Sequence, residues 1–127
     1  DREQLLDLVR RRKEEWGMDY VFLATEENAN VEWFRAAFGD QLLVMDRERY
    51  NGWHIYTKED PNPLYQAGKK HLTALNYLAE MELLAACDGL ISSITSGVRY
   101  AIFRNGGRYS HLELLDCGRF PDQRRRH

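Results

Sequence analysis

Short apolar runs alternate with helix-forming segments along this chain, and this alternation constrains the fold more than any other feature. Four runs are predicted strands: 20–25, 41–46, 88–93 and 112–117. The first is continuously apolar, β-branched or aromatic, as in a parallel strand buried on both faces, and the second is also expected to be buried. Helical spacing is found at 2–16, in a segment ending at Gly39, at 69–87 and at 96–104. We therefore predict an α/β fold, Rossmann-like, with three α/β/α layers and a mainly parallel sheet of about four strands.

The helical segments carry signals for their own ends and faces. Gly17 and Gly39 are expected to end the first two helices, and Asn28 or Asn30 to cap the start of the second. The segment 69–87 is the strongest helix, because alanine, leucine, glutamate and methionine dominate it. One side of this helix is lined by Leu72, Leu75, Ala79 and Leu83.

Length and charge favour one globular domain. The 127 residues are 43% hydrophobic and 30% charged, so we place a single half-domain at 1–120 and a basic tail at 121–127. A formal charge of −2 gives no electrostatic reason to expect nucleic acid as the main partner. No apolar run approaches the roughly 18 residues of a membrane-spanning helix. Because the chain starts without methionine inside a predicted helix, we expect a fragment of a longer protein.

The cysteines and histidines do not have the spacing of a metal site. Cys87 and Cys117 form no CxxC pair, and the four histidines are scattered, so no metal is expected. Both cysteines lie in apolar runs. Buried free thiols are the expectation, and a disulfide between them stays open.

Polar and small side chains gather after three of the predicted strands, where open α/β sheets bind ligands. Glu26 and Glu27 follow the first strand, and Asp46 follows the second. A long loop at 47–68 comes next, and loops of this length are often functional. Its aromatic residues, Tyr50, Trp53, Tyr56 and Tyr65, are candidates for a protein or glycan contact. The third strand leads into Ser92, Ser93, Thr95, Ser96 and Gly97.

The segment 93–97 has two interpretations. The first turn of a helix has unpaired amides and a positive dipole end, so small and hydroxyl residues there suit a phosphate or pyrophosphate. Arg99 lies about one turn further on, where it could add a contact or point to solvent. The simpler interpretation is a plain helix cap, which needs only one hydroxyl. The segment is neither a Walker A motif nor a dinucleotide fingerprint.

Three glutamates also have two interpretations each. Helical spacing puts Glu80 on a largely apolar face with Tyr77 and Leu84, so its carboxylate needs a partner or a cleft. The alternative is that Glu80 lies at the helix margin and reaches water. Glu26 and Glu27 can likewise belong to a binding edge or to a solvated turn.

Taken in order, these positions resemble the fucosyltransferase superfamily, in particular its α1,6-fucosyltransferases. The segment "VFLATEEN" is similar to the family's strand followed by an acidic pair. The segment "ALNYLAEMELLAACDGLISSITSGV" is similar to its acidic helix, third strand and hydroxyl turn, and "FGDQLLVMD" falls where a second strand belongs. The resemblance covers about residues 20–103.

The resemblance implies the C-terminal, donor-binding half of a two-domain glycosyltransferase. Such enzymes transfer fucose from GDP-fucose to a glycan or protein hydroxyl, with inversion and without a metal. It implies that Thr95 and Ser96 lie near the diphosphate, that Glu80 contacts guanine, and that Glu26 and Glu27 replace an aspartate pair. The donor-binding residues expected are Glu26, Glu27, Glu80, Ser93, Thr95, Ser96, Gly97 and Arg99.

The chain also departs from the family pattern. All three family aspartates are glutamates here, and Arg99 is displaced by one position. The H-x-R segment that grips the diphosphate and the acceptor-binding N-terminal half are absent from this sequence. We therefore assign no catalytic residue and expect the chain alone to be inactive. One alternative is a non-catalytic α/β interaction module. A receiver domain ranks last, because the Asp and Lys it requires are missing.

Overall fold

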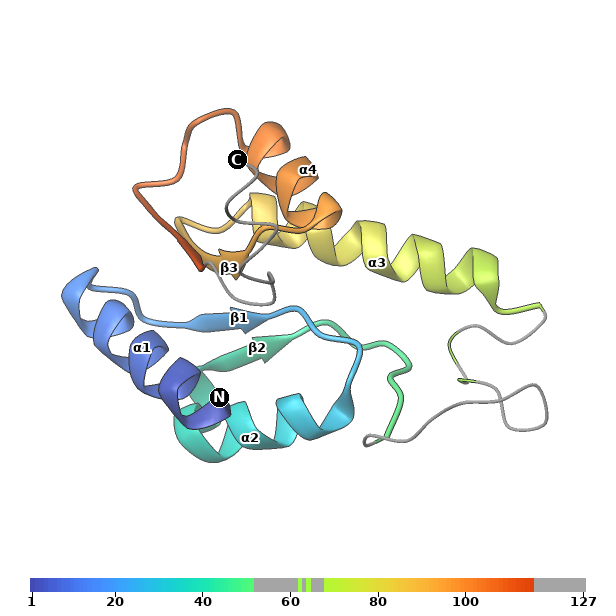
Figure 1. Ribbon diagram of the computed structural model, residues 1–127, viewed down its shortest axis with the longest axis horizontal. Helices are drawn as coiled ribbons and strands as arrows, with labels where there is room; N and C mark the ends of the chain where they lie inside the picture. Colours follow the sequence, from blue (N-terminus) through green and yellow to red (C-terminus); the bar gives the residue numbers. More distant parts are fainter. Residues whose placement is uncertain (52–61, 63, 65–67, 116–127) are drawn as a thin grey trace, which may run out of the picture. The chain divides into compact units, whose positions relative to one another are not determined.

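The computed structural model describes residues 1–51, 62, 64 and 68–115, and its elements alternate as the sequence predicts (Figure 1). In chain order they are α1 (Arg2–Glu15), β1 (Val21–Leu23), α2 (Asn28–Phe38), the 3-10 turn η1 (Gly39–Gln41), β2 (Leu42–Val44), α3 (Lys70–Ala85), β3 (Gly89–Ser93), α4 (Ser96–Asn105) and β4 (His111–Leu115). The α/β prediction is confirmed. Residues 116 and 117 of the predicted fourth strand, the 121–127 tail, and Trp53, Tyr56, Tyr65 and Cys117 lie outside the described residues.

The described strands form two parallel pairs. Strand β1 pairs with β2, and β3 pairs with β4, so the single sheet of about four strands is not shown. Each pair is joined through one helix, α2 or α4, because parallel neighbours need a crossover connection. The chain divides into two compact units, residues 1–80 and 81–127, and each unit contains one of these β-α-β motifs.

In the N-terminal unit, α2 packs beside β1 and β2 (Figure 1). Its buried side chain Phe34 stacks at a tilt on Phe38, with ring centroids 5.9 Å apart. Other core residues of this unit are Leu6, Val9, Leu42 and Leu64. The sequence predicts strands that are buried on both faces. This prediction is wrong for β2, because Leu43 is 48% exposed. Leu42, the residue before it, is 4% exposed, and successive side chains of a strand point to opposite faces, so β2 has one packed face and one open face.

The helix ends follow the sequence signals in part. Gly17 adopts a positive φ of 65° directly after Trp16, the C-cap of α1, as a C-terminal glycine should. The prediction that Asn28 or Asn30 caps α2 is wrong. The N-cap is Glu27, which makes no side-chain capping bond, and Asn28 is already helical. Its amide side chain instead donates to the carbonyl of Arg49 and to Asn51.

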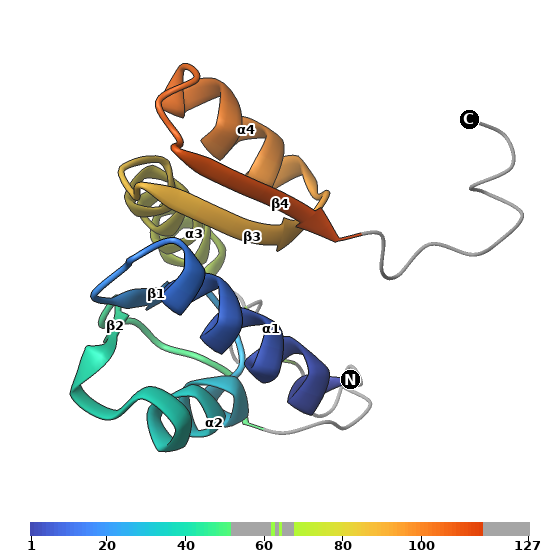
Figure 2. The ribbon, with the colours of Figure 1, turned by 90° about the vertical axis from the view of Figure 1, so that its left-hand side faces the viewer.

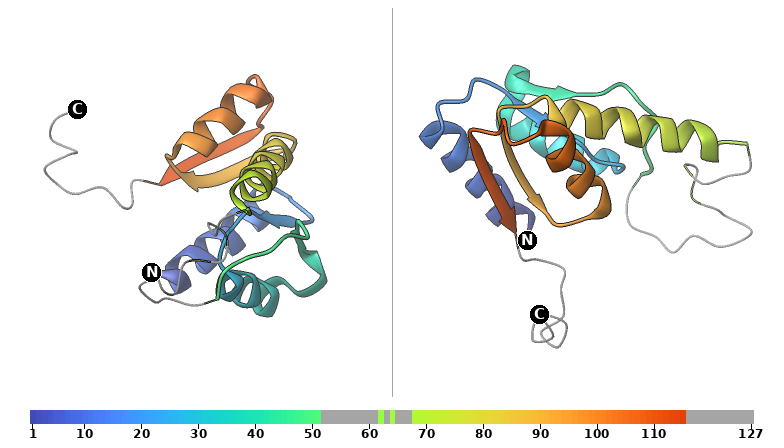
Figure 3. Two further views of the ribbon diagram at one scale, coloured as in Figure 1. Left: turned by 90° about the vertical axis from the view of Figure 1, so that its right-hand side faces the viewer. Right: turned by 90° about the horizontal axis from the view of Figure 1, so that it is seen from above.

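In the C-terminal unit, α4 lies along the β3–β4 pair (Figures 2 and 3). Val98, Ala101 and Leu90 are buried there. Asn105, the last residue of α4, is also buried, and its side chain donates to the carbonyl of Ala85 and accepts from the amide of Tyr109. These bonds fix the turn that returns the chain to β4.

Helix α3 buries the side opposite to its leucine stripe. Leu72, Leu75 and Leu83 are 53%, 49% and 44% exposed, whereas Thr73, Glu80, Met81 and Ala85 are buried. The helix therefore turns its polar residues Thr73 and Glu80 inward. Over the described residues, no helix is long and apolar enough to cross a membrane.

Candidate functional site

The ladder between β1 and β2 opens at its carboxyl end. Paired residues in the strands are 21 positions apart, from Val21 opposite Leu42 to Leu23 opposite Val44. The next bridge joins Glu27 to Tyr50, which are 23 positions apart. The segment that follows β2 therefore contains two more residues between these pairings than the segment that follows β1. The widened segment lies at the sheet edge where the sequence predicts a binding site.

The guanidinium of Arg49 fills this opening. It donates to the carbonyls of Thr25 at 2.9 Å, Met45 at 2.7 Å and Arg47 at 3.5 Å. One side chain thus donates to carbonyls of both backbone segments, the one after β1 and the one after β2, where the backbone ladder is interrupted. Arg49 holds the two strand ends at a fixed separation.

Arg47 and Glu80 form a buried ion pair beside Arg49. The Nη1 atom of Arg47 donates to Oε1 of Glu80 at 2.5 Å, and their side chains are 0% and 2% exposed. Oε2 of Glu80 lies 3.6 Å from Nη2 of Arg49. Among the described residues, neither Nη2 of Arg47 nor Oε2 of Glu80 has a hydrogen-bond partner. The expectation that Glu80 needs a partner is confirmed, and the water-reaching alternative is wrong.

This environment perturbs the neighbouring cation. Burial lowers the pKa of Arg49 from its usual value, since desolvation disfavours the charged form. The carboxylate of Glu80 opposes that shift, and the positive charge of Arg47 adds to it. The cluster is therefore one in which two desolvated cations share one buried anion.

The acidic pair after β1 separates into two environments. Glu27 is 4% exposed, so it does not lie in a solvated turn, and its Oε1 is 3.4 Å from Nη2 of Arg2. Arg2 also lies over the Trp33 ring, 5.3 Å from its centroid. Glu26 is half-buried, and its carbonyl accepts from the amide of Tyr50. Glu27 therefore forms an ion pair with a residue of α1.

The first turn of α4 has both the cap and the open donors that the sequence suggests. Thr95 is the N-cap, and its hydroxyl accepts from the amide of Val98 at 3.2 Å. No described residue accepts from the amides of Ser96 and Gly97. Ser96 is exposed and Gly97 buried, so the hydroxyl of Ser96 is open to solvent while the backbone beside it is packed. The plain-cap interpretation is confirmed for Thr95.

The remaining candidate residues of this segment, Ser93 and Arg99, make fewer interactions. Ser93 is half-buried, and its carbonyl accepts from Ser92. The side chain of Arg99 is exposed, which matches the alternative that it points to solvent. The expected donor-binding residues are thus divided, with Glu26, Glu27 and Glu80 in the N-terminal unit and Ser93 to Arg99 in the C-terminal unit.

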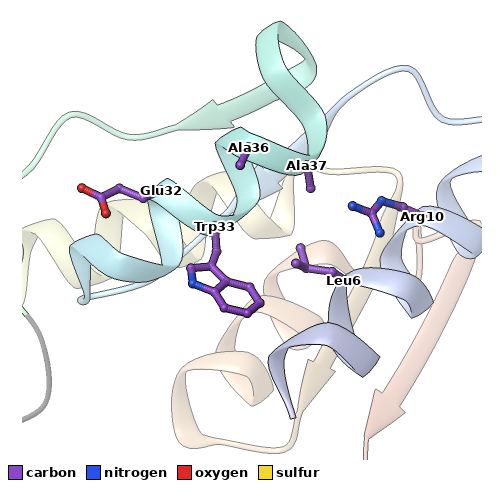
Figure 4. A pocket seen from close by; sticks show the side chains of 6 residues that line it. All are labelled: Leu6, Arg10, Glu32, Trp33, Ala36 and Ala37. Atoms are coloured by element: carbon purple, nitrogen blue, oxygen red, sulfur yellow. The ribbon is translucent and has the colours of Figure 1, made fainter.

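A hollow lies between α1 and α2 (Figure 4). It has a volume of about 300 Å³. Its lining residues are Leu6, Arg10, Glu32, Trp33, Ala36 and Ala37. Two alanines opposite a leucine leave room that larger side chains would fill, and Trp33 forms one wall. The sequence offers no signal for this hollow, because it depends on how the two helices cross.

Reactive and metal-binding groups are sparse in the described part of the chain. Cys87 is a half-buried free thiol whose pKa is raised by burial and by Asp88, so it is a weak nucleophile. No three histidine, cysteine or acidic side chains cluster among the described residues.

No protein-family model, no curated protein and no solved structure matches this chain. Arg47 and Arg49 are the site residues that sequence reasoning misses. The sequence signal for them is that the carboxylate of Glu80 needs a partner, but the sequence does not show which cation is that partner.

Proposed function

We propose that this chain is the donor-binding half of an inverting glycosyltransferase that uses a GDP-sugar, with GDP-fucose as the expected donor. In the reaction, an acceptor hydroxyl oxygen bonds to C1 of the sugar while the bond from C1 to the diphosphate oxygen breaks. GDP leaves with the negative charge. The role assigned to this half is to orient the donor and stabilise that charge.

The observation that carries the proposal is the open first turn of α4. Its cap uses the hydroxyl of Thr95, which leaves the amides of Ser96 and Gly97 and the exposed hydroxyl of Ser96 available. Such donors at the positive end of a helix favour a diphosphate. The resemblance of the surrounding segment to fucosyltransferases supports the same assignment.

Glu80 is the residue that we assign to the base. Its Oε1 is taken by Arg47, whereas Oε2 accepts no hydrogen bond from a described residue. A carboxylate oxygen in that state suits the N–H groups of guanine, which neither adenine nor uracil presents in the same arrangement. This gives the proposal a nucleotide preference that can be measured.

The test is titration calorimetry of the chain with GDP, ADP and UDP. We expect weak binding of GDP and weaker binding of the other two. Ser96→Asp should abolish GDP binding because its carboxylate repels phosphate, while helix stability is kept or improved. Arg108→Gln is the matched control, since it also changes the net charge by −1, at an exposed site. No heat with GDP at millimolar concentration would refute the proposal.

A non-catalytic interaction module is the second candidate. One observation favours it, namely that the arginines already neutralise Glu80, as in a site that has lost its nucleotide. In that case no nucleotide should raise the melting temperature. Stabilisation by GDP alone would exclude this candidate.

A further inference from the structure

Arg47 is a buried cation with unused hydrogen-bond donors. Its side chain has no exposed surface, and its Nη2 donates to no described residue. Nη1 is taken by Glu80 and Nε by the carbonyl of Glu48 at 3.2 Å. A buried charged donor without an acceptor is costly, and a bound anion is one of the few arrangements that removes the cost.

Arg49 provides an internal comparison. It occupies the same edge of the β1–β2 pair, yet all its nitrogens donate to carbonyls of Thr25, Met45 and Arg47. Its role is accounted for by the backbone that it joins. The same surroundings therefore hold one guanidinium whose three nitrogens all donate and one whose Nη2 does not, and packing alone does not explain the difference.

The charge balance points the same way. Two buried guanidiniums, from Arg47 and Arg49, share the single buried carboxylate of Glu80. Asp46 acts on Arg49 as well, but it is exposed and its charge is screened by water. A second anion at this position would pair the remaining positive charge, which is otherwise desolvated without compensation.

We propose that Arg47, with Arg49 beside it, forms a binding site for a phosphate or sulfate group at the carboxyl edge of the β1–β2 pair. The two N–H groups of Nη2 match the oxygens of a tetrahedral oxyanion. Oε2 of Glu80 can in addition accept from a protonated phosphate oxygen, which sulfate lacks at neutral pH. The site is closed in this conformation, so the anion displaces a side chain as it enters. It uses none of the residues in the first turn of α4, but it shares Glu80, which the proposed function assigns to the base.

The experiment is a titration of the chain with inorganic phosphate and with sulfate, at constant ionic strength set by chloride. We expect saturable binding of both, with phosphate the tighter. Arg47→Lys keeps the charge but loses the second donor, so affinity should fall by about tenfold, as for one lost charge-assisted hydrogen bond. Arg104→Lys, at an exposed arginine, is the matched control and should bind as the unmodified chain does.

A second variant separates lost binding from damaged folding. Glu80→Gln still accepts from Arg47 but removes a competing negative charge, so it should bind sulfate, which does not use Oε2, more tightly. A variant that only disturbs the fold would bind more weakly. Equal binding by the Arg47→Lys variant, weaker binding of sulfate by the Glu80→Gln variant, or a response that chloride reproduces would each overturn the site.

Ser96→Asp distinguishes this site from the first turn of α4. Phosphate binding that survives Ser96→Asp and is lost with Arg47→Lys supports the Arg47 site. Phosphate binding lost with Ser96→Asp and kept with Arg47→Lys places the anion at α4 instead, which refutes this inference and leaves the proposed function intact.

Discussion

The ion pair of Arg47 and Glu80 gives the sharpest stability prediction. Replacing Glu80 by leucine removes the only described side-chain partner of Arg47 and leaves a fully buried guanidinium without a counter-charge. Breaking a buried pair in this way costs about 3–5 kcal/mol, against about 0–1 kcal/mol for an exposed pair. The exposed fractions of 0% and 2% place this pair in the first class.

Most of that cost should come from Arg47. Arg49 keeps its bonds to the carbonyls of Thr25 and Met45 when Glu80 is lost, but Arg47 keeps only its bond to Glu48. The double variant Arg47→Met with Glu80→Leu replaces the pair by apolar side chains, so it should recover most of the lost stability. Arg49→Met with Glu80→Leu should not recover it.

Urea unfolding followed by tryptophan fluorescence measures these effects. All three tryptophans precede residue 81, so the signal reports the N-terminal unit. For a slope near 2 kcal/mol per molar urea, the midpoint of the Glu80→Leu variant should fall by roughly 1.5–2.5 M. A fall of less than about 0.5 M would refute the reasoning, as would a double variant no more stable than the single one.

Two smaller effects can be measured in the C-terminal unit. Thr95→Ala should lower its unfolding free energy by about 1 kcal/mol through loss of the cap on Val98, while Thr95→Ser should leave it nearly unchanged, as a thermal melt can show. The hydroxyl of Tyr100 lowers the pKa of Glu82, with Arg104 contributing less, so this contact stabilises above the usual carboxyl pKa and is lost as the pH falls through the lowered value. Tyr100→Phe should raise the pKa of Glu82 in an NMR titration, and an unchanged pKa would contradict the assignment.

The order of elements could be predicted from the sequence because each β-α-β motif is local. The period of the apolar residues changes between strand and helix within a few positions, and every predicted element is present. The pairing of strands into a four-stranded sheet is a longer-range property. Only neighbours joined by one helix are shown to pair, as β1 with β2 and β3 with β4.

The sequence predicts that the carboxylate of Glu80 needs a partner, but it does not identify that partner. The helical position of Glu80 shows that its carboxylate cannot be left alone in an apolar face. Its partner Arg47 is 33 residues earlier, in a segment whose composition reads as loop. The prediction of the α2 cap was wrong for a similar reason. The side chain of Asn28 donates to Arg49 and Asn51, and such long-range bonds cannot be predicted from the local sequence.

The interrupted ladder between β1 and β2 makes this site a matter of chain length as much as of side chains. The offset between partners grows from 21 to 23, and the added residues create the gap that Arg49 spans. Removing two residues from 45–49 would let the backbone pair without a break from Val21 to Glu27. The sheet would become more regular and the gap that Arg49 spans would close. Insertions and deletions in this short stretch are thus the changes by which evolution could switch the site on or off while the core stays the same.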